Sequence, residues 1–331
     1  MIRIDGNSCL NQRYKKSECN RCRIACPSKC IQEDLKVNSN DCDDCGICLS
    51  VCPAEAISSS EVSSKDLQEL ITADESCLVL SCRLRDKQSS WRCLGFIDIR
   101  LIFSLILSGA KKNRQIVIKN QLCNTCKPQV GKYLNELFHE ANKILILAEK
   151  NPIIQGFNSD SIRMHETLIS RRNLFKSIIR KGAKFLSESL DEEKIFGRQS
   201  RQMLFSQYES SIDIPIMEPT ALFNAISYSD SCNACASCEK ICPQNAIKIK
   251  EQGEKLEFYH NSRVCSGCEI CIVNCPQEAI TLKFATYLGI YKVAEHKLPR
   301  CVQCGNLYMP IANQEICIQC MLKNPLKIDW L

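Results

Sequence analysis

Two runs of cysteine between residues 232 and 276 restrict the possible folds of this chain more than any other feature. Each run has the spacing C-x2-C-x2-C-x3-C-P. Cysteines at positions i, i+3 and i+6 can wrap a tight loop around one cubic iron–sulfur cluster, while the fourth, before proline, leaves that loop. Zinc sites use two paired knuckles instead, and disulfide scaffolds are usually short and secreted. The spacing therefore predicts iron–sulfur clusters.

The stretch that contains these runs resembles the bacterial-type ferredoxins that carry two 4Fe–4S clusters. The resemblance implies that the fourth cysteine of each run ligates the cluster of the other run. One cluster would then be held by Cys232, Cys235, Cys238 and Cys275. The other would be held by Cys265, Cys268, Cys271 and Cys242.

The fragment Cys-Pro-x-x-Ala-Ile is repeated along the chain. It occurs at residues 52–57, 242–247 and 275–280, and residues 26–31 form a fourth copy in which Cys30 replaces the alanine. Four copies in two pairs predict two ferredoxin units. We expect the isoleucine of each copy to pack between the clusters, where an apolar shell helps to set the reduction potential.

The N-terminal unit is regular only in its second half. Its first half lacks one cysteine, because Lys16 stands at the expected position. Cys9 and Cys30 are the two candidates for that ligand, and we favour Cys9, which would close a longer loop. A 3Fe–4S cluster on three ligands, with Cys9 a buried thiol, is the alternative. The predicted sets are Cys9, Cys19, Cys22 and Cys52, and Cys42, Cys45, Cys48 and Cys26.

Residues 65–150 have the pattern of a small parallel α/β domain. Apolar runs at Leu78–Leu80, Gln115–Ile118 and Ile144–Leu147 predict three strands. Helical spacing at Ile97–Leu107 and Val130–Ala141 predicts the helices between them. In such folds ligands gather beyond the carboxyl ends of the strands.

Four cysteines of this domain form a candidate third site, and two of them follow predicted strands. Their spacing is similar to that of thioredoxin-like 2Fe–2S ferredoxins. The Cys93-Leu94-Gly95 turn with the helix after it resembles the small iron–sulfur subunit associated with hydrogenase and heterodisulfide reductase. The resemblance implies a 2Fe–2S or another iron–sulfur cluster; zinc and a redox dithiol are the alternatives. The four cysteines are Cys82, Cys93, Cys123 and Cys126.

Two further C-x2-C knuckles lie near the end of the sequence. Two knuckles separated by twelve residues are typical of a closed tetrahedral site, as in a zinc ribbon, so we expect a structural zinc ion. Rubredoxin-like iron uses the same geometry and is the alternative. The knuckles are Cys301 with Cys304, and Cys317 with Cys320.

Composition limits the classes of function. The 26 cysteines in 331 residues indicate metal binding in a reducing compartment. The formal charge of +6 counts every cysteine as neutral, and clusters with thiolate ligands are anionic. The basic excess therefore balances cluster charge, and we expect no nucleic-acid partner. The start lacks an apolar signal region and no apolar run could span a membrane, which predicts a cytoplasmic protein.

The predicted fold class is a multidomain α+β protein. Two ferredoxin-like units, residues 1–60 and 226–290, flank an α/β domain (65–150) and a helical linker (151–225), and a zinc ribbon (296–325) follows. We expect a one-electron relay between partner oxidoreductases in an anaerobic or reducing cytoplasm. By resemblance the partners would be a molybdopterin enzyme, a hydrogenase or a heterodisulfide-type reductase. The alternatives are a reductase that acts at the four central cysteines and an iron–sulfur redox sensor.

Overall fold

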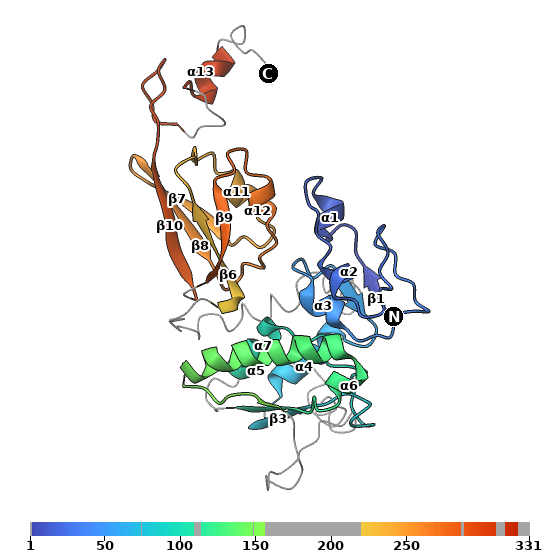
Figure 1. Ribbon diagram of the computed structural model, residues 1–331. Coiled ribbons are helices and arrows are strands. Elements are labelled where there is room, and N and C mark those ends of the chain that lie inside the picture. Colours follow the sequence, from blue (N-terminus) through green and yellow to red (C-terminus); the bar gives the residue numbers. More distant parts are fainter. Residues whose placement is uncertain are drawn as a thin grey trace, which may run out of the picture. The chain divides into compact units, whose positions relative to one another are not determined.

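The computed structural model describes residues 2–73, 75–108, 114–147, 149–155, 220–285, 288–308 and 315–323. It divides into two compact units, Met1–Ile216 and Met217–Leu331, and most of their elements are labelled in Figure 1. Residues 156–219, most of the predicted helical linker, lie outside the described residues. No helix in the described ranges is both long enough and apolar enough to cross a membrane.

The first unit begins with a small domain built around its cysteines. Strands β1 (Ile2–Ile4) and β2 (Ile57–Ser59) pair antiparallel and bring the two ends of the domain together. Helices α1 (Leu10–Arg13), α2 (Arg21–Ala25) and α3 (Ile47–Val51) lie between them in the sequence. These helices are short because each ends at or near a Cys-Pro step or a turn, and proline cannot continue a helix.

An α/β domain follows in the same unit. Its three-stranded parallel sheet has the order β3 (Cys77–Leu80), β4 (Gln115–Ile118) and β5 (Ile154–Gln155). Helix α5 (Ile99–Leu107) joins the first two strands, and the four-residue α6 (Cys123–Cys126) leads into α7 (Pro128–Leu147), the long green helix of Figure 1.

Two N-terminal caps define where the helices of this domain start. The carboxylate of Asp98 accepts a hydrogen bond from the backbone N–H of Leu101, 2.9 Å away, at the start of α5. Helix α4 (Ser64–Thr72) starts with a reciprocal capping box between Ser63 and Asp66. Both caps satisfy backbone donors that have no partner inside the helix.

The strand predicted at residues 144–147 is wrong. These residues form the last turn of α7, and the third strand is β5. Ile144 and Leu145 are buried, whereas Ile146 and Leu147 are 62% and 50% exposed, as expected on a helix whose apolar face turns away from them. Four consecutive apolar residues do not distinguish a short strand from a helix end, so the pattern was ambiguous.

The second unit contains two antiparallel sheets. Strand β6 (Thr220–Tyr228) pairs with β9 (Ile280–Ala285). Strands β7 (Ile247–Gln252), β8 (Lys255–Asn261) and β10 (Ile290–Lys297) form a sheet in the order β10-β8-β7. Helices α11 (Ser237–Ile241) and α12 (Ile270–Val273) follow the two cysteine loops, and α13 (Ile318–Lys323) lies in the last cysteine-rich segment.

The core of the second unit is formed by apolar residues of both sheets. Phe258 and Leu256 of β8 are each 1% exposed and pack in one cluster with Ile226, Ile247 and Ile280. Ile226 belongs to β6, which begins at Thr220, so this strand includes residues that the sequence assigns to the linker. The sheet core therefore fixes the loops that carry the cysteines.

Candidate iron–sulfur and metal sites

The first predicted cysteine set of the N-terminal domain is assembled around Cys22. Burial raises the pKa of Cys22 to about 11, and the charges of Cys52, Cys19 and Cys9 add to this effect. Cys9 directly precedes α1, Cys22 lies in α2 and Cys52 follows α3. Three short helices thus bring the four sulfurs predicted for the first set into one neighbourhood.

The second N-terminal set is centred on Cys48 in α3. Burial raises the pKa of this thiol above its ordinary range, and the charges of Cys45, Cys26, Cys22 and Cys42 act in the same direction. Three of these neighbours belong to the predicted second set, whereas Cys22 belongs to the first. The two predicted sets are therefore adjacent.

Cys30 lies with the second set rather than the first. Its sulfur is 3.5 Å from that of Cys26, and it is 4% exposed. Burial raises its pKa to about 12, and the charges of Cys26 and Cys42 contribute. Of the two cysteines considered for the missing ligand of the first set, it is Cys9 that the structure brings to Cys22.

The Cys-Pro-x-x-Ala repeat has a structural reason. In three copies the backbone N–H at the alanine position points at the sulfur of the cysteine four residues earlier. These contacts join Ala56 to Cys52 and Ala246 to Cys242, each at 3.3 Å, and Ala279 to Cys275 at 3.4 Å. The donors would stabilise thiolates at these positions. The isoleucines that follow, Ile31, Ile57, Ile247 and Ile280, are all buried.

In the second unit, one set is assembled at the end of β6. Burial raises the pKa of Cys238 to about 11, while a hydrogen bond from Tyr228 lowers it and the charges of Cys232 and Cys235 raise it. The Tyr228 hydroxyl oxygen is 3.2 Å from the Cys238 sulfur. Burial raises the pKa of Cys232, and the charges of Cys275 and Cys235 contribute. These are the four cysteines of the first predicted C-terminal set.

The other C-terminal set lines a pocket. Burial raises the pKa of Cys271 above its ordinary range, and the charges of Cys268, Cys265, Cys242 and Cys238 act in the same direction. The pocket walls carry all four predicted ligands and the apolar side chains of Ile226, Ile247 and Leu282. Its cysteines are Cys242, Cys265, Cys268 and Cys271.

The same pocket has polar atoms that suit an inorganic cluster. Ser266 Oγ and His260 Nε2 are buried there without a hydrogen-bond partner among the described residues. A bound cluster would offer them sulfur acceptors, because cluster sulfides accept hydrogen bonds from the protein. The sequence did not indicate His260, because no motif surrounds this residue. It lines the pocket because strand β8, which carries it, passes beside the cysteine loop.

The four central cysteines gather at the carboxyl ends of the parallel strands. Cys82 follows β3, and Cys123 and Cys126 belong to α6, which comes soon after β4. Burial raises the pKa of Cys123 to about 12, and the charges of Cys93, Cys82 and Cys126 contribute. Cys126 is exposed at the surface. The other three cysteines predicted for this site, Cys82, Cys93 and Cys126, therefore lie near Cys123.

The C-terminal knuckles bring four sulfurs close together. The sulfurs of Cys301, Cys304, Cys317 and Cys320 all lie within 4.8 Å of one another. The backbone N–H of Cys317 is 3.3 Å from the Cys301 sulfur and is the main cause that lowers the pKa of Cys301 to about 6. Four converging sulfurs suit a single tetrahedral metal ion.

Two segments of the chain match known families of iron–sulfur domains. Residues 231–279 match the family described as 4Fe-4S dicluster domain, and residues 35–58 match the family described as 4Fe-4S binding domain. The chain is also similar to the pyruvate synthase subunit PorD of Methanothermobacter marburgensis, with 38% identity over 54 residues. That match spans 16% of this chain and 58% of the relative, less than two thirds of its length. The chain therefore contains two ferredoxin-type domains that bind 4Fe–4S clusters.

Proposed function

We propose that this protein is a multi-cluster electron-transfer protein that passes single electrons between partner oxidoreductases. Four 4Fe–4S clusters occupy the paired sets in the two ferredoxin-type domains, with Cys9 as a ligand of the first. The observation that carries the proposal is the proximity of the paired sets, since the charge of Cys22 acts on Cys48 and the charge of Cys238 acts on Cys271. Clusters bound side by side can exchange electrons without release to solvent.

The central cysteines bind a further iron–sulfur cluster, and the knuckles bind a structural zinc ion. The grouping of Cys82, Cys93 and Cys126 around Cys123 supports the first assignment. The convergence of four sulfurs supports the second. The polypeptide supplies the cysteine ligands, the backbone N–H donors and the apolar isoleucines that shield the clusters, while the clusters supply the redox chemistry.

The partner is proposed to be a larger oxidoreductase of which this chain is a subunit or electron donor. The similar protein from Methanothermobacter marburgensis is named as a subunit of pyruvate synthase, which supports a role within an enzyme assembly. The resemblances noted in the sequence extend the candidates to molybdopterin enzymes, hydrogenases and heterodisulfide-type reductases. A reductase that uses Cys123 as a nucleophile is less favoured, because burial raises the pKa of this thiol and nucleophilic cysteines need a lowered one.

The test is a count of iron, acid-labile sulfide and zinc in protein purified without oxygen. About 18 iron, 18 sulfide and one zinc per chain are expected for four cubes, a 2Fe–2S cluster and one zinc ion. About 16 iron would mean that the central site holds no iron, and near 8 iron would refute the two-domain relay. A reversible reduction of each cluster, followed by electron paramagnetic resonance (EPR), would complete the test.

A further inference from the structure

The loop that carries Cys93 lies directly against the loop that carries Cys45. A Cβ atom added to Gly95 would be 2.5 Å from the carbonyl oxygen of Cys45 and 3.1 Å from the nitrogen of Ile47. Gly46 has a positive φ of 81° and faces Phe96 in the same way, with 3.1 Å from an added Cβ to the Phe96 nitrogen. The two backbones therefore meet without a side chain between them at this point.

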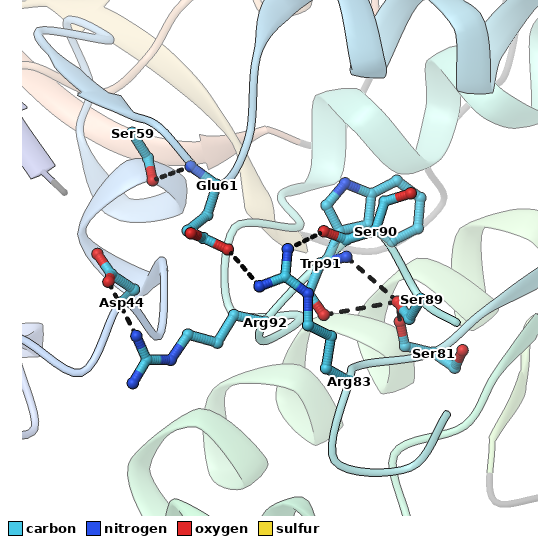
Figure 2. A network of polar contacts seen from close by, with 9 residues as sticks. All are labelled: Asp44, Ser59, Glu61, Ser81, Arg83, Ser89, Ser90, Trp91 and Arg92. Atoms are coloured by element: carbon cyan, nitrogen blue, oxygen red, sulfur yellow. Dashed lines mark hydrogen bonds and ion pairs between the residues drawn. The ribbon is translucent and has the colours of Figure 1, made fainter. Parts of the chain in front are cut away.

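Ion pairs hold the two domains together around this contact, which we call the junction (residues 43–47 and 93–96). Asp44 is paired with Arg92 at 3.1 Å, and Glu61 with Arg83 at 2.9 Å, as Figure 2 shows. A third pair joins Asp43 to Lys127. Asp43 and Asp44 belong to the N-terminal domain, and Glu61 lies two residues after its last strand, β2, whereas each cation belongs to the α/β domain. Three ion pairs of opposite charge thus hold the two segments of the junction against each other.

Lys127 is a partly buried cation at the junction that directly follows Cys126. It follows α6 directly, and its side chain is 19% exposed. Asp43, the ion-pair partner of Lys127, lies two residues before Cys45, and the Cys45 carbonyl faces Gly95, two residues after Cys93. The ammonium group therefore acts electrostatically on a ligand of the proposed N-terminal cluster and on a ligand of the proposed central cluster.

We propose that the junction is an electron-transfer contact between these two clusters, and that Lys127 sets the potentials of both. The electron passes between the cluster of Cys26, Cys42, Cys45 and Cys48 and the cluster of Cys82, Cys93, Cys123 and Cys126. One cluster loses one electron and the other gains it, and no covalent bond changes. The inference rests on the proposed function, because it requires iron at the central cysteines.

The charge of Lys127 determines the direction of its effect. A reduced cluster carries one more negative charge than an oxidised cluster. A cation held close by, in a partly buried position, therefore stabilises the reduced form. Asp43 partly offsets this charge, and it also keeps the ammonium group in place.

The experiment compares K127Q and K127R with K132Q in the anaerobically purified full chain. Lys132 lies five residues later, on α7; its side chain is 79% exposed and pairs with Glu136 of the same helix rather than with a residue of the junction. Each cluster is titrated with a reductant and followed by EPR. In K127Q we expect the equilibrium constant for reduction to fall about tenfold at both junction clusters, which is about 59 mV for one electron. K127R should retain the potentials of the natural protein, as should K132Q.

A second measurement tests the contact itself. When both junction clusters are reduced and paramagnetic, their EPR signals should be broadened or split by each other. The Gly95→Ala change, which forces the loops apart without changing any charge, should weaken that interaction while the central iron is retained.

The possible outcomes distinguish a failure of the proposed junction from a failure of the central-cluster assignment. Central iron with no magnetic interaction, or a potential shift at only one cluster in K127Q, would overturn the junction while leaving the relay intact. A central site without iron in the natural protein would overturn both the central-cluster assignment and the junction. A potential shift in K132Q as large as that in K127Q would show that general surface charge, not position, is responsible.

Discussion

The hydroxyl group of Tyr228 is expected to raise the reduction potential of one C-terminal cluster, and Tyr228→Phe tests this. The hydroxyl lies 3.2 Å from the sulfur of Cys238. As a cluster ligand Cys238 would be a thiolate, with no proton to give, so the phenol must be the donor. Burial, followed by the charge of Cys238, raises the pKa of Tyr228 above its ordinary range, which keeps that proton in place at any working pH.

The size of the effect follows from the strength of this hydrogen bond. A hydrogen bond to a charged acceptor contributes about 1.5–3 kcal/mol. Because the added electron is spread over the whole cluster, roughly a third to a half of that energy distinguishes the reduced from the oxidised form. This corresponds to about 0.5–1.5 kcal/mol, or about 20–60 mV for one electron. Removal of the donor should lower the potential by this amount.

The substitution is conservative in every other respect. The ring of Tyr228 packs edge-on against Phe258, with 5.1 Å between the ring centroids, and phenylalanine keeps that contact. Tyr259→Phe is the matched control, since its hydroxyl donates to Glu257 at 2.6 Å and is not bonded to a cysteine. The assay is an EPR-monitored redox titration of the full chain. A potential in Y228F that is unchanged or higher, with full iron content, would refute the reasoning.

Three other predictions concern the ligands and the stability of the domains. Cys9→Ser should lower the iron content and give the EPR signal of a 3Fe–4S cluster, whereas Cys30→Ser should change neither the iron content nor the spectrum. Full iron content and an unaltered EPR spectrum in C9S would show that Cys9 is not a ligand. Cys317→Ser should abolish the zinc found by elemental analysis without changing the visible absorption of the 4Fe–4S clusters, and iron in place of zinc in the natural protein would contradict the assignment. Asp98→Ala should lower the local stability of α5 by about 1–2 kcal/mol, because the capped N–H of Leu101 loses its partner; hydrogen exchange of the α5 amides measures this, with Ser63→Ala as the exposed-cap comparison.

The cysteine spacing made most of the site predictable, for a local reason. A loop that wraps one cluster uses residues close in sequence, so its spacing is visible in the chain itself. The fourth ligand is recognised by the proline after it, and the alanine four residues later supplies the N–H that points at its sulfur, as Ala246 does for Cys242. Where this local pattern is interrupted, at Lys16, the sequence could only offer Cys9 and Cys30 as candidates, and the fold was needed to show which neighbours each has.

The groups that surround the sulfurs could not be predicted in the same way. Tyr228 and His260 are ordinary strand residues in the sequence, and they reach the cysteines because β6 and β8 pass beside the cysteine loops. The strand expected at residues 144–147 failed for the opposite reason. There the apolar run was clear, but its period over only four residues could not separate a strand from the end of α7.

No sequence pattern indicates the junction, because its residues are far apart in the chain and belong to no motif. Asp43 and Lys127 are 84 residues apart, and in the sequence each looks like an ordinary charged surface residue. Gly95 and Gly46 would be assigned to turns in any sequence-based interpretation, yet a Cβ on either would meet the backbone of the opposite loop. Ion pairs at or near the surface contribute little stability individually, about 0–1 kcal/mol each. In each of these three pairs one partner is partly buried and so held in place, which suits a role in fixing orientation. A fixed orientation matters most where two redox centres must stay close, which is the role proposed for these residues.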